Sequence, residues 1–99
     1  MSQEVIIKAI KDRNLLKFSH KGSFKVVEPH LLGENKHHKI CLSAFQVKTY
    51  AKSGVIIPWR EYLLDEITEL EILPDVFAGP RPHYEPTPNR RFATAIAQL

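Results

Sequence analysis

The chain is organised around one stretch, Trp59-Arg60-Glu61-Tyr62-Leu63-Leu64-Asp65-Glu66-Ile67. Polar and apolar residues alternate through its first half, and this alternation predicts a β-strand over residues 55–63. A short acidic segment follows and ends on Ile67. What this strand presents, and to what kind of partner, is the functional question that the sequence raises.

Arg60 is the unusual residue of this strand. It shares one face with Tyr62 and with apolar neighbours, and a buried guanidinium without a partner is costly. Two arrangements remain open on this pattern. Arg60 either has a structural role, by pairing with the carboxylate of Glu28 or Asp65 or by snorkelling past Tyr62 to reach water, or it opens onto a cleft where a ligand or water meets it.

The rest of the chain predicts a mainly β fold with flanking helices. Residues 2–13 carry an apolar face at helical spacing, with an acidic first turn and a basic last turn, so we expect a helix there. The predicted strands span residues 15–20, 24–32, 37–48, 55–63 and 69–73. Bulges are expected at Pro29 and near Phe45, where the apolar phase shifts. A small five-stranded barrel or sandwich accounts for this pattern.

The composition changes after residue 77. Residues 78–99 form a proline-rich tail, and Thr87-Pro88 is typical of the start of a short helix. Phe92, Ile96 and Leu99 would form one apolar stripe on that terminal helix. Such a short helix is marginal alone, so three possibilities stay open: it packs back on residues 1–77, pairs with another copy, or frays.

Length and composition limit the class of protein. Ninety-nine residues fit one domain, and no run is long and apolar enough for a membrane span or a signal peptide, which favours a cytoplasmic protein without membrane partners. Residues 1–60 hold eleven Lys or Arg and four Asp or Glu, whereas residues 61–99 hold three and seven. This asymmetry suits an anionic partner at one face, or mutual neutralisation after folding. Cys41 has no second cysteine to pair with.

The chain lacks the motifs of common enzymes. It has no glycine-rich phosphate loop, no nucleophile elbow and no metalloprotease helix. His37 and His38 are adjacent, so on a strand they would point to opposite faces and could not share a metal ion. We therefore expect a protein that is not an enzyme and that uses no metal and no cofactor.

Four blocks in order give a resemblance to a known family. They are Ile6-Ile7-Lys8-Ala9-Ile10, Leu16-Lys17-Phe18-Ser19-His20-Lys21-Gly22, Val27-Glu28-Pro29-His30 and Arg60-Glu61-Tyr62-Leu63-Leu64-Asp65-Glu66-Ile67. Together these blocks resemble WYL domains over about residues 3–77. The chain has Ile40-Cys41 where that family carries its eponymous Trp-Tyr, His20 where tyrosine is common, and Glu66 where a basic residue is frequent.

The resemblance implies a fold and a function. The fold would be an Sm-like, SH3-type barrel over residues 1–77. The function would be ligand sensing in bacterial transcription regulation or phage defence, through a basic pocket that binds an anionic ligand such as single-stranded nucleic acid, an oligonucleotide or a nucleotide. The pocket candidates are Arg60, His20, Ser19, His30, Lys21 and Lys17. Tyr50 or Trp59 is a further candidate for stacking on a base.

A second hypothesis belongs to another class of function. The terminal stripe of Phe92, Ile96 and Leu99 would make the chain a protein-interaction module that docks on a protein partner or forms a homodimer, without a small ligand.

Overall fold

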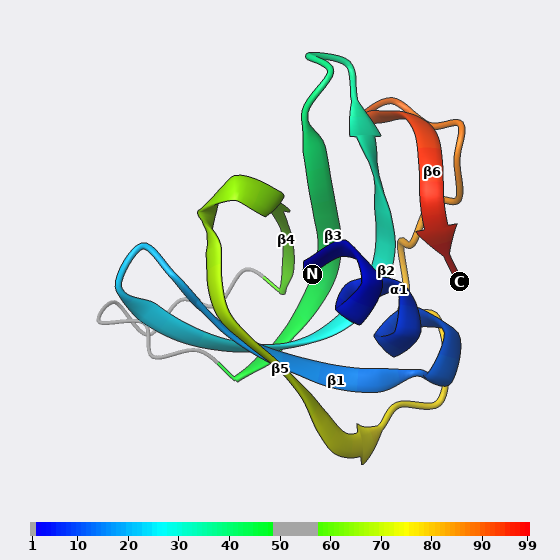
Figure 1. Ribbon diagram of the computed structural model, residues 1–99. Helices are drawn as coiled ribbons and strands as arrows, with labels where there is room; N and C mark the ends of the chain where they lie inside the picture. Colours follow the sequence, from blue (N-terminus) through cyan, green and yellow to red (C-terminus); the bar gives the residue numbers. More distant parts are fainter. Residues whose placement is uncertain (1, 49–57) are drawn as a thin grey trace.

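The computed structural model describes residues 2–48 and 58–99 and shows a mainly β fold with one N-terminal helix (Figure 1). Its elements are α1 (Ser2–Asp12), β1 (Asn14–His20), β2 (Ser23–Asn35), β3 (Ile40–Lys48), β4 (Trp59–Leu63), the 3₁₀ turn η1 (Leu64–Glu66), β5 (Ile67–Val76) and β6 (Phe92–Gln98). The predicted N-terminal helix and the five predicted strands are confirmed with small changes at their ends. Residues 55–57 of the predicted fourth strand lie outside the described residues.

The long strand β2 is the centre of one antiparallel sheet. Its strand order is β4-β3-β2-β1-β5, and β6 pairs with β2 as well. Strand β3 lies along one edge of β2, while β1 pairs with residues 23–27 and β6 with residues 31–35 of β2 on the other edge. The sheet is not closed, because β4 and β5 at its two ends are not paired with each other.

Between its two partners, β2 changes direction. The ladder with β3 shifts register between Pro29 and Leu31, which confirms the bulge predicted at Pro29. A second shift, opposite residues 46–48, follows closely after Phe45. A bulge adds a residue to one strand and bends it. The extra residue is His30 of β2 at the first shift and Val47 of β3 at the second, so the bend of β2 at His30 lies where this strand leaves β1 and continues beside β6.

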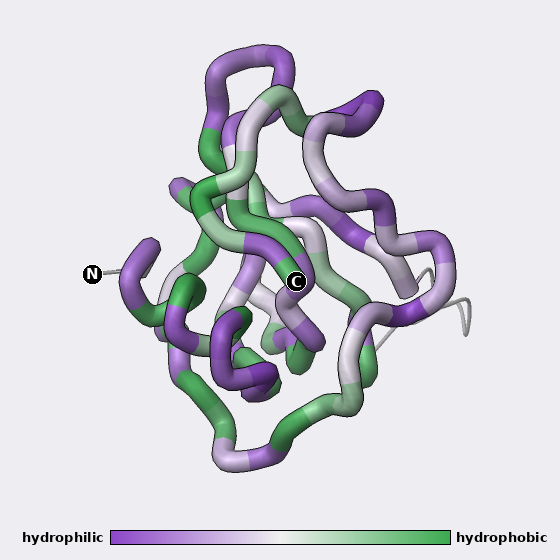
Figure 2. The backbone as a smooth tube through the Cα atoms, turned by 90° about the vertical axis from the view of Figure 1, so that its right-hand side faces the viewer, coloured by the Kyte–Doolittle hydropathy of each residue, from purple (hydrophilic) through white to green (hydrophobic). Residues whose placement is uncertain are grey.

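The main core lies between α1 and the sheet. Ile6, Ala9 and Ile10 are the buried residues of α1, and the helix packs on β1, β2, β5 and β6. Figure 2 shows the alternation of apolar and polar residues along this helix, and the hydrophilic β2–β3 turn at the top. The sheet residues of this core are Leu16, Phe18, Val27, Leu32, Leu42, Ala44, Tyr62 and Ile67. The N-terminal helix is therefore an integral part of the fold.

The predicted C-terminal helix is wrong, because residues 92–98 form strand β6. The segment is rich in alanine, which favours a helix in isolation. However, residues 31–35 of β2 present unpaired backbone groups, and pairing with β6 satisfies them. Gly33 allows this approach: a Cβ at this position would collide with the carbonyl of Thr94. A local preference for helix is thus overridden by a tertiary contact.

The strand also divides the expected apolar stripe. Phe92 is buried against Leu31 and Cys41, and Leu99 packs at the margin of the main core. Ile96 is exposed, since a register shift between Leu32 and Gly33 in the β2–β6 ladder leaves it unpaired. Of the three possibilities for residues 78–99, the structure shows that they pack back on the chain itself.

Candidate functional site

Two of the predicted pocket residues contact Tyr62, and a third, Lys21, lies near Glu66. The Arg60 guanidinium carbon lies 6.0 Å from the centre of the Tyr62 ring, and the His20 ring meets the same ring edge-on at 4.9 Å. Glu66 lies 3.4 Å from Nε2 of His20 and 3.9 Å from Nζ of Lys21. This carboxylate stands beside both groups, so it offsets part of the positive potential at this end of β1.

The other predicted pocket residues lie elsewhere. Lys17 and Ser19 point to the face of β1 opposite Phe18 and His20, and Lys17 places its ammonium 5.1 Å from the centre of the exposed Phe24 ring. His30 is fully buried. The structure therefore does not bring the predicted residues together in one basic pocket.

Arg60 itself is exposed at the end of the sheet. Glu28, one of its two expected partners, pairs with Arg81 instead. Within residues 2–48 and 58–99, no carboxylate lies within ion-pair distance of Arg60. The expected ion pairs with Glu28 and Asp65 are therefore wrong for the described residues, and the guanidinium is exposed beside the Tyr62 ring.

Arg60 lines a surface groove of about 350 Å³. Strand β4 and the chain that precedes β6 form its two main walls. The lining residues are Leu31, Ser43, Trp59, Arg60, Glu61, His83, Tyr84, Glu85, Asn89, Arg90, Arg91 and Phe92. Seven of these twelve come from residues 83–92, in the region that the sequence predicted to be a weakly structured tail.

Side chains fix this second wall in place. The Asn89 side-chain carbonyl oxygen accepts hydrogen bonds from the backbone N–H groups of Arg91 and Phe92, both at 2.8 Å, and its amide donates to the carbonyl of Glu85. The guanidinium of Arg91 reaches across the groove to Glu61 of β4 at 2.8 Å. Hydrogen bonds and an ion pair thus replace the helix that the sequence predicted here.

An aromatic pair forms another part of the lining. The rings of Trp59 and Tyr84 are nearly parallel, with an interplanar angle of 15° and centroids 6.4 Å apart. The indole N–H of Trp59 donates to the carbonyl of Pro82 at 2.9 Å, and the hydroxyl of Tyr84 donates to the carbonyl of Leu99 at 3.2 Å. Each polar atom is directed to a backbone partner, which orients both rings.

The charges of the groove sum to a modest positive excess. Arg60, Arg90 and Arg91 line it together with Glu61 and Glu85. Arg91 and Glu61 balance each other. Neither Arg60 nor Arg90 has an ion-pair partner in the part of the chain that the structure describes. A guanidinium offers a planar set of donors that matches phosphate, so the groove combines aromatic rings with groups that recognise an oxyanion.

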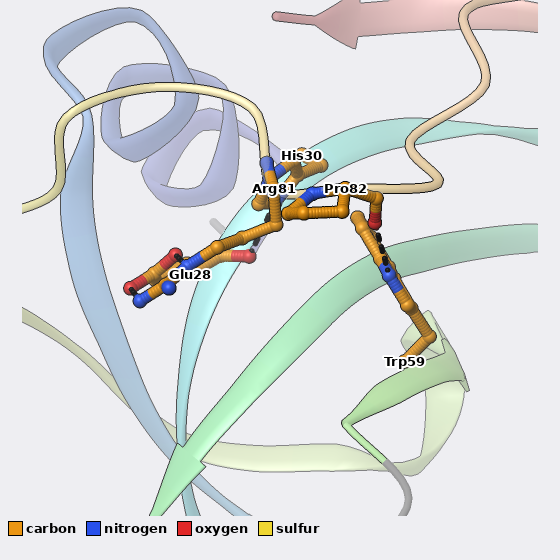
Figure 3. A network of polar contacts seen from close by, with 5 residues as sticks. All are labelled: Glu28, His30, Trp59, Arg81 and Pro82. Carbon is orange, nitrogen blue, oxygen red and sulfur yellow. Dashed lines mark hydrogen bonds and ion pairs between the residues drawn. The ribbon is translucent and has the colours of Figure 1, made fainter.

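Residues 77–84 are held on β2 by a compact polar network (Figure 3). The Arg81 side chain donates two hydrogen bonds to the buried Glu28 carboxylate, at 2.7 and 2.8 Å, and its guanidinium lies 4.6 Å from the centre of the Phe45 ring. The backbone N–H of Arg81 donates to Nε2 of His30 at 3.0 Å. In this way the segment next to the groove is fixed to the bend of β2.

The partners of His30 define its protonation state. Nδ1 lies 2.8 Å from the carbonyl of Glu28, which can only accept, while Nε2 faces the N–H of Arg81, which can only donate. The ring is therefore neutral with its proton on Nδ1. Burial lowers the pKa of His30 below its ordinary value, and the nearby Arg81 acts in the same direction.

The sequence missed the residues of the second wall. Tyr84, Arg90 and the fixing residues Arg81 and Asn89 all lie in the proline-rich region. The sequence Asn89-Arg90-Arg91 could have indicated an ordered, basic turn here, because asparagine often caps a turn with its side chain. Tyr50, a predicted stacking residue, lies outside the described residues.

Two further findings concern the described residues as a whole. Among residues 2–48 and 58–99, no three His, Cys, Asp or Glu side chains meet in a metal-ligating cluster. No helix in this part of the chain has the length and apolar character to cross a bilayer. Comparison with protein-family models, curated proteins and solved structures gives no significant match to the chain.

Proposed function

We propose that this protein is a non-enzymatic ligand-binding domain whose groove takes an anionic ligand with a planar ring, such as a nucleotide or single-stranded nucleic acid. One observation carries the proposal: Arg60 and Arg90, both without a described ion-pair partner, line the same groove as the aromatic rings of Trp59 and Tyr84. Stacking on such rings is worth about 1–3 kcal/mol per base, and guanidinium groups bind phosphate with paired donors.

The proposal includes a family and a setting. The open antiparallel sheet would be a divergent Sm-like, SH3-type barrel of the WYL kind, acting as a sensor in bacterial transcription regulation or phage defence. The resemblance of four sequence blocks supports this part of the proposal, and so does the position of Arg60 beside an accessible groove. The basic character of the site would come from Arg90 as well as Arg60, rather than from His20 and Lys21.

The alternative, a protein-interaction module, relied on a terminal helix. Within the described residues this segment is a strand, and Phe92 is used in the chain's own core. We therefore favour the ligand-binding proposal over dimerisation through Phe92, Ile96 and Leu99.

Fluorescence anisotropy with labelled single-stranded DNA and RNA at about 50 and about 200 mM salt tests the proposal. We expect binding that weakens with salt. Arg60→Ala and Arg90→Ala should each weaken it further and reduce the salt slope by about 0.7 for each phosphate that the variant no longer neutralises. Lys11→Ala is the matched control, because it removes one exposed positive charge from α1, which contributes no residue to the groove.

Two results would refute the nucleic-acid version. One is the absence of binding at the lower salt concentration. The other is an equal loss of affinity in Arg60→Ala and in Lys11→Ala, because that pattern indicates attraction by net charge alone.

A further inference from the structure

We propose that neutral His30 holds residues 77–84 in place, and that protonation of His30 in mild acid releases this segment and thereby dismantles one wall of the groove. The release itself is independent of any ligand. Its consequence, a loss of ligand affinity on acidification, rests on the function proposed above.

The chemistry of residues 80–82 makes His30 the partner of their backbone, beside the side-chain pair of Arg81 with Glu28. Pro80 and Pro82 have no backbone N–H, so Arg81 supplies the single N–H donor of this tripeptide backbone. That N–H is directed at Nε2 of His30. A proton on Nε2 would convert the acceptor into a donor and place two N–H groups against each other. The hydrogen bond would then be lost, and the segment would have to move to separate the two donors.

Aromatic side chains surround the His30 ring and exclude water from it, and this desolvation opposes a positive charge. Trp59 of β4 meets His30 edge-on at 4.8 Å, Phe77 stacks on it at 5.5 Å, and Tyr84 lies at 5.3 Å. Trp59 and Phe77 carry no titratable group, and the Tyr84 phenol, whose pKa is raised by burial, stays neutral in this range.

Two charged groups also act on His30. The guanidinium of Arg81 comes from the same segment and disfavours the imidazolium. The Glu28 carboxylate on β2 favours it, but this carboxylate already accepts both hydrogen bonds from Arg81. Desolvation is the largest influence on the pKa of His30, and its direction is downward.

The sign of the pH effect follows from this lowered pKa. After release of residues 77–84, His30 would titrate near its ordinary pKa of 6.5. In the closed state, in which this segment lies on β2, the pKa of His30 is lower. The released state therefore binds more protons in mild acid. Above about pH 6.5 the closed state is fully favoured. Below about pH 6.5 the equilibrium constant for release rises by up to about tenfold per pH unit, until the pH reaches the pKa of His30 in the closed state.

The released segment would carry groove residues with it. Pro82 accepts the indole hydrogen bond of Trp59, and Tyr84 lines the groove two residues further on. Trp59 is the one tryptophan of the chain. Its fluorescence therefore reports directly on the contact with His30 and Pro82.

The test records Trp59 emission of the full chain from about pH 8 to about pH 5, alongside the imidazole nitrogen and Arg81 amide resonances by NMR. We expect emission, the His30 resonances and the Arg81 amide to change with one midpoint below about 6.5. His30→Gln is the conservative variant, because its amide both donates and accepts without titrating. It should retain the closed structure and lose the transition. His37→Gln, at an exposed position of the β2–β3 turn outside the groove lining, is the control and should keep the transition.

The NMR titration of the wild-type chain needs no variant, so the test holds even if His30→Gln does not fold. An Arg81 amide that keeps its position while His30 becomes protonated would overturn the proposal, as would a Trp59 transition that is identical in His30→Gln. Oligonucleotide affinity that stays constant through the Trp59 transition would overturn the coupling to the groove. A failure of all oligonucleotides to bind at about pH 8 would instead refute the proposed function and leave the release measurable.

Discussion

The guanidinium of Arg81 binds the carboxylate of Glu28 through two hydrogen bonds that join positions 53 residues apart in the sequence. Glu28 lies at the bend of β2 and its side chain is only 5% exposed, whereas that of Arg81 is 44% exposed. The pair therefore fixes the C-terminal quarter of the chain to the centre of the sheet. This contact turns a proline-rich segment into an ordered wall of the groove.

Arg81→Ala should destabilise the protein because it leaves the buried Glu28 carboxylate without its partner. Breaking a fully buried pair costs about 3–5 kcal/mol. Solvent reaches Arg81 here, so we expect a loss nearer about 2 kcal/mol in urea denaturation. Lys8→Ala removes an exposed pair with Asp12 and should cost less than about 0.5 kcal/mol. Equal losses of stability in the two variants would show that the Glu28–Arg81 pair stabilises the protein no more than an exposed ion pair does.

Gly33→Ala should displace β6 from β2. The added Cβ would meet the backbone carbonyl of Thr94, which cannot move aside as a flexible side chain could. Overpacking of this kind costs about 1–3 kcal/mol, and hydrogen exchange should accelerate in residues 92–98. Gly22→Ala serves as the control. Its position has a φ of +82° and no neighbouring atoms within 4 Å, so it should lower stability without faster exchange in β6.

Phe92→Ala and Ile96→Ala should have unequal effects. Phe92 is 2% exposed and packs on Leu31, so its truncation should cost about 3 kcal/mol. Ile96 is 42% exposed, and its truncation should cost less than about 1 kcal/mol. Thermal or urea denaturation measures both. On a helix the two residues would share one apolar face, whereas in β6, with its register shifts against β2, Ile96 is exposed, so similar losses would contradict this arrangement.

Tyr62→Phe should stabilise the protein. The Tyr62 hydroxyl is buried and has no hydrogen-bond partner within the described residues, and burial raises its pKa to about 12. Removing an unsatisfied buried hydroxyl is worth about 1 kcal/mol. The matched variant is Tyr84→Phe, which loses the hydrogen bond to Leu99 and should be destabilised by about 1 kcal/mol. A drop in stability of Tyr62→Phe would mean that its hydroxyl is bonded.

Much of the fold could be predicted from local patterns. The apolar periods of α1 and of the strands, and the bulge at Pro29, follow from steric rules that act within a few residues. The terminal strand could not be predicted in this way. Its alanine-rich sequence favours a helix, and β6 forms because Gly33 leaves room on a distant strand.

The candidate site was predictable only in part. Arg60 was identified because it is a cation on an otherwise apolar face, and it does line the groove. His30 was assigned to the same pocket, yet the chain uses it to hold Arg81. Contacts between Glu28 and Arg81 depend on the path of the whole chain. No spacing in the sequence reveals such a pair.

The central claim is that the groove between β4 and residues 83–92 binds an anionic ligand with a planar ring. The most direct measurement is an NMR titration of the ¹⁵N-labelled chain with a short single-stranded oligonucleotide at low salt. We predict that amide shifts concentrate at residues 59–61, 83–85 and 89–92, with the indole N–H of Trp59 among the strongest. Shifts concentrated around Lys17 and Phe24, or no shifts at saturating oligonucleotide, would contradict it.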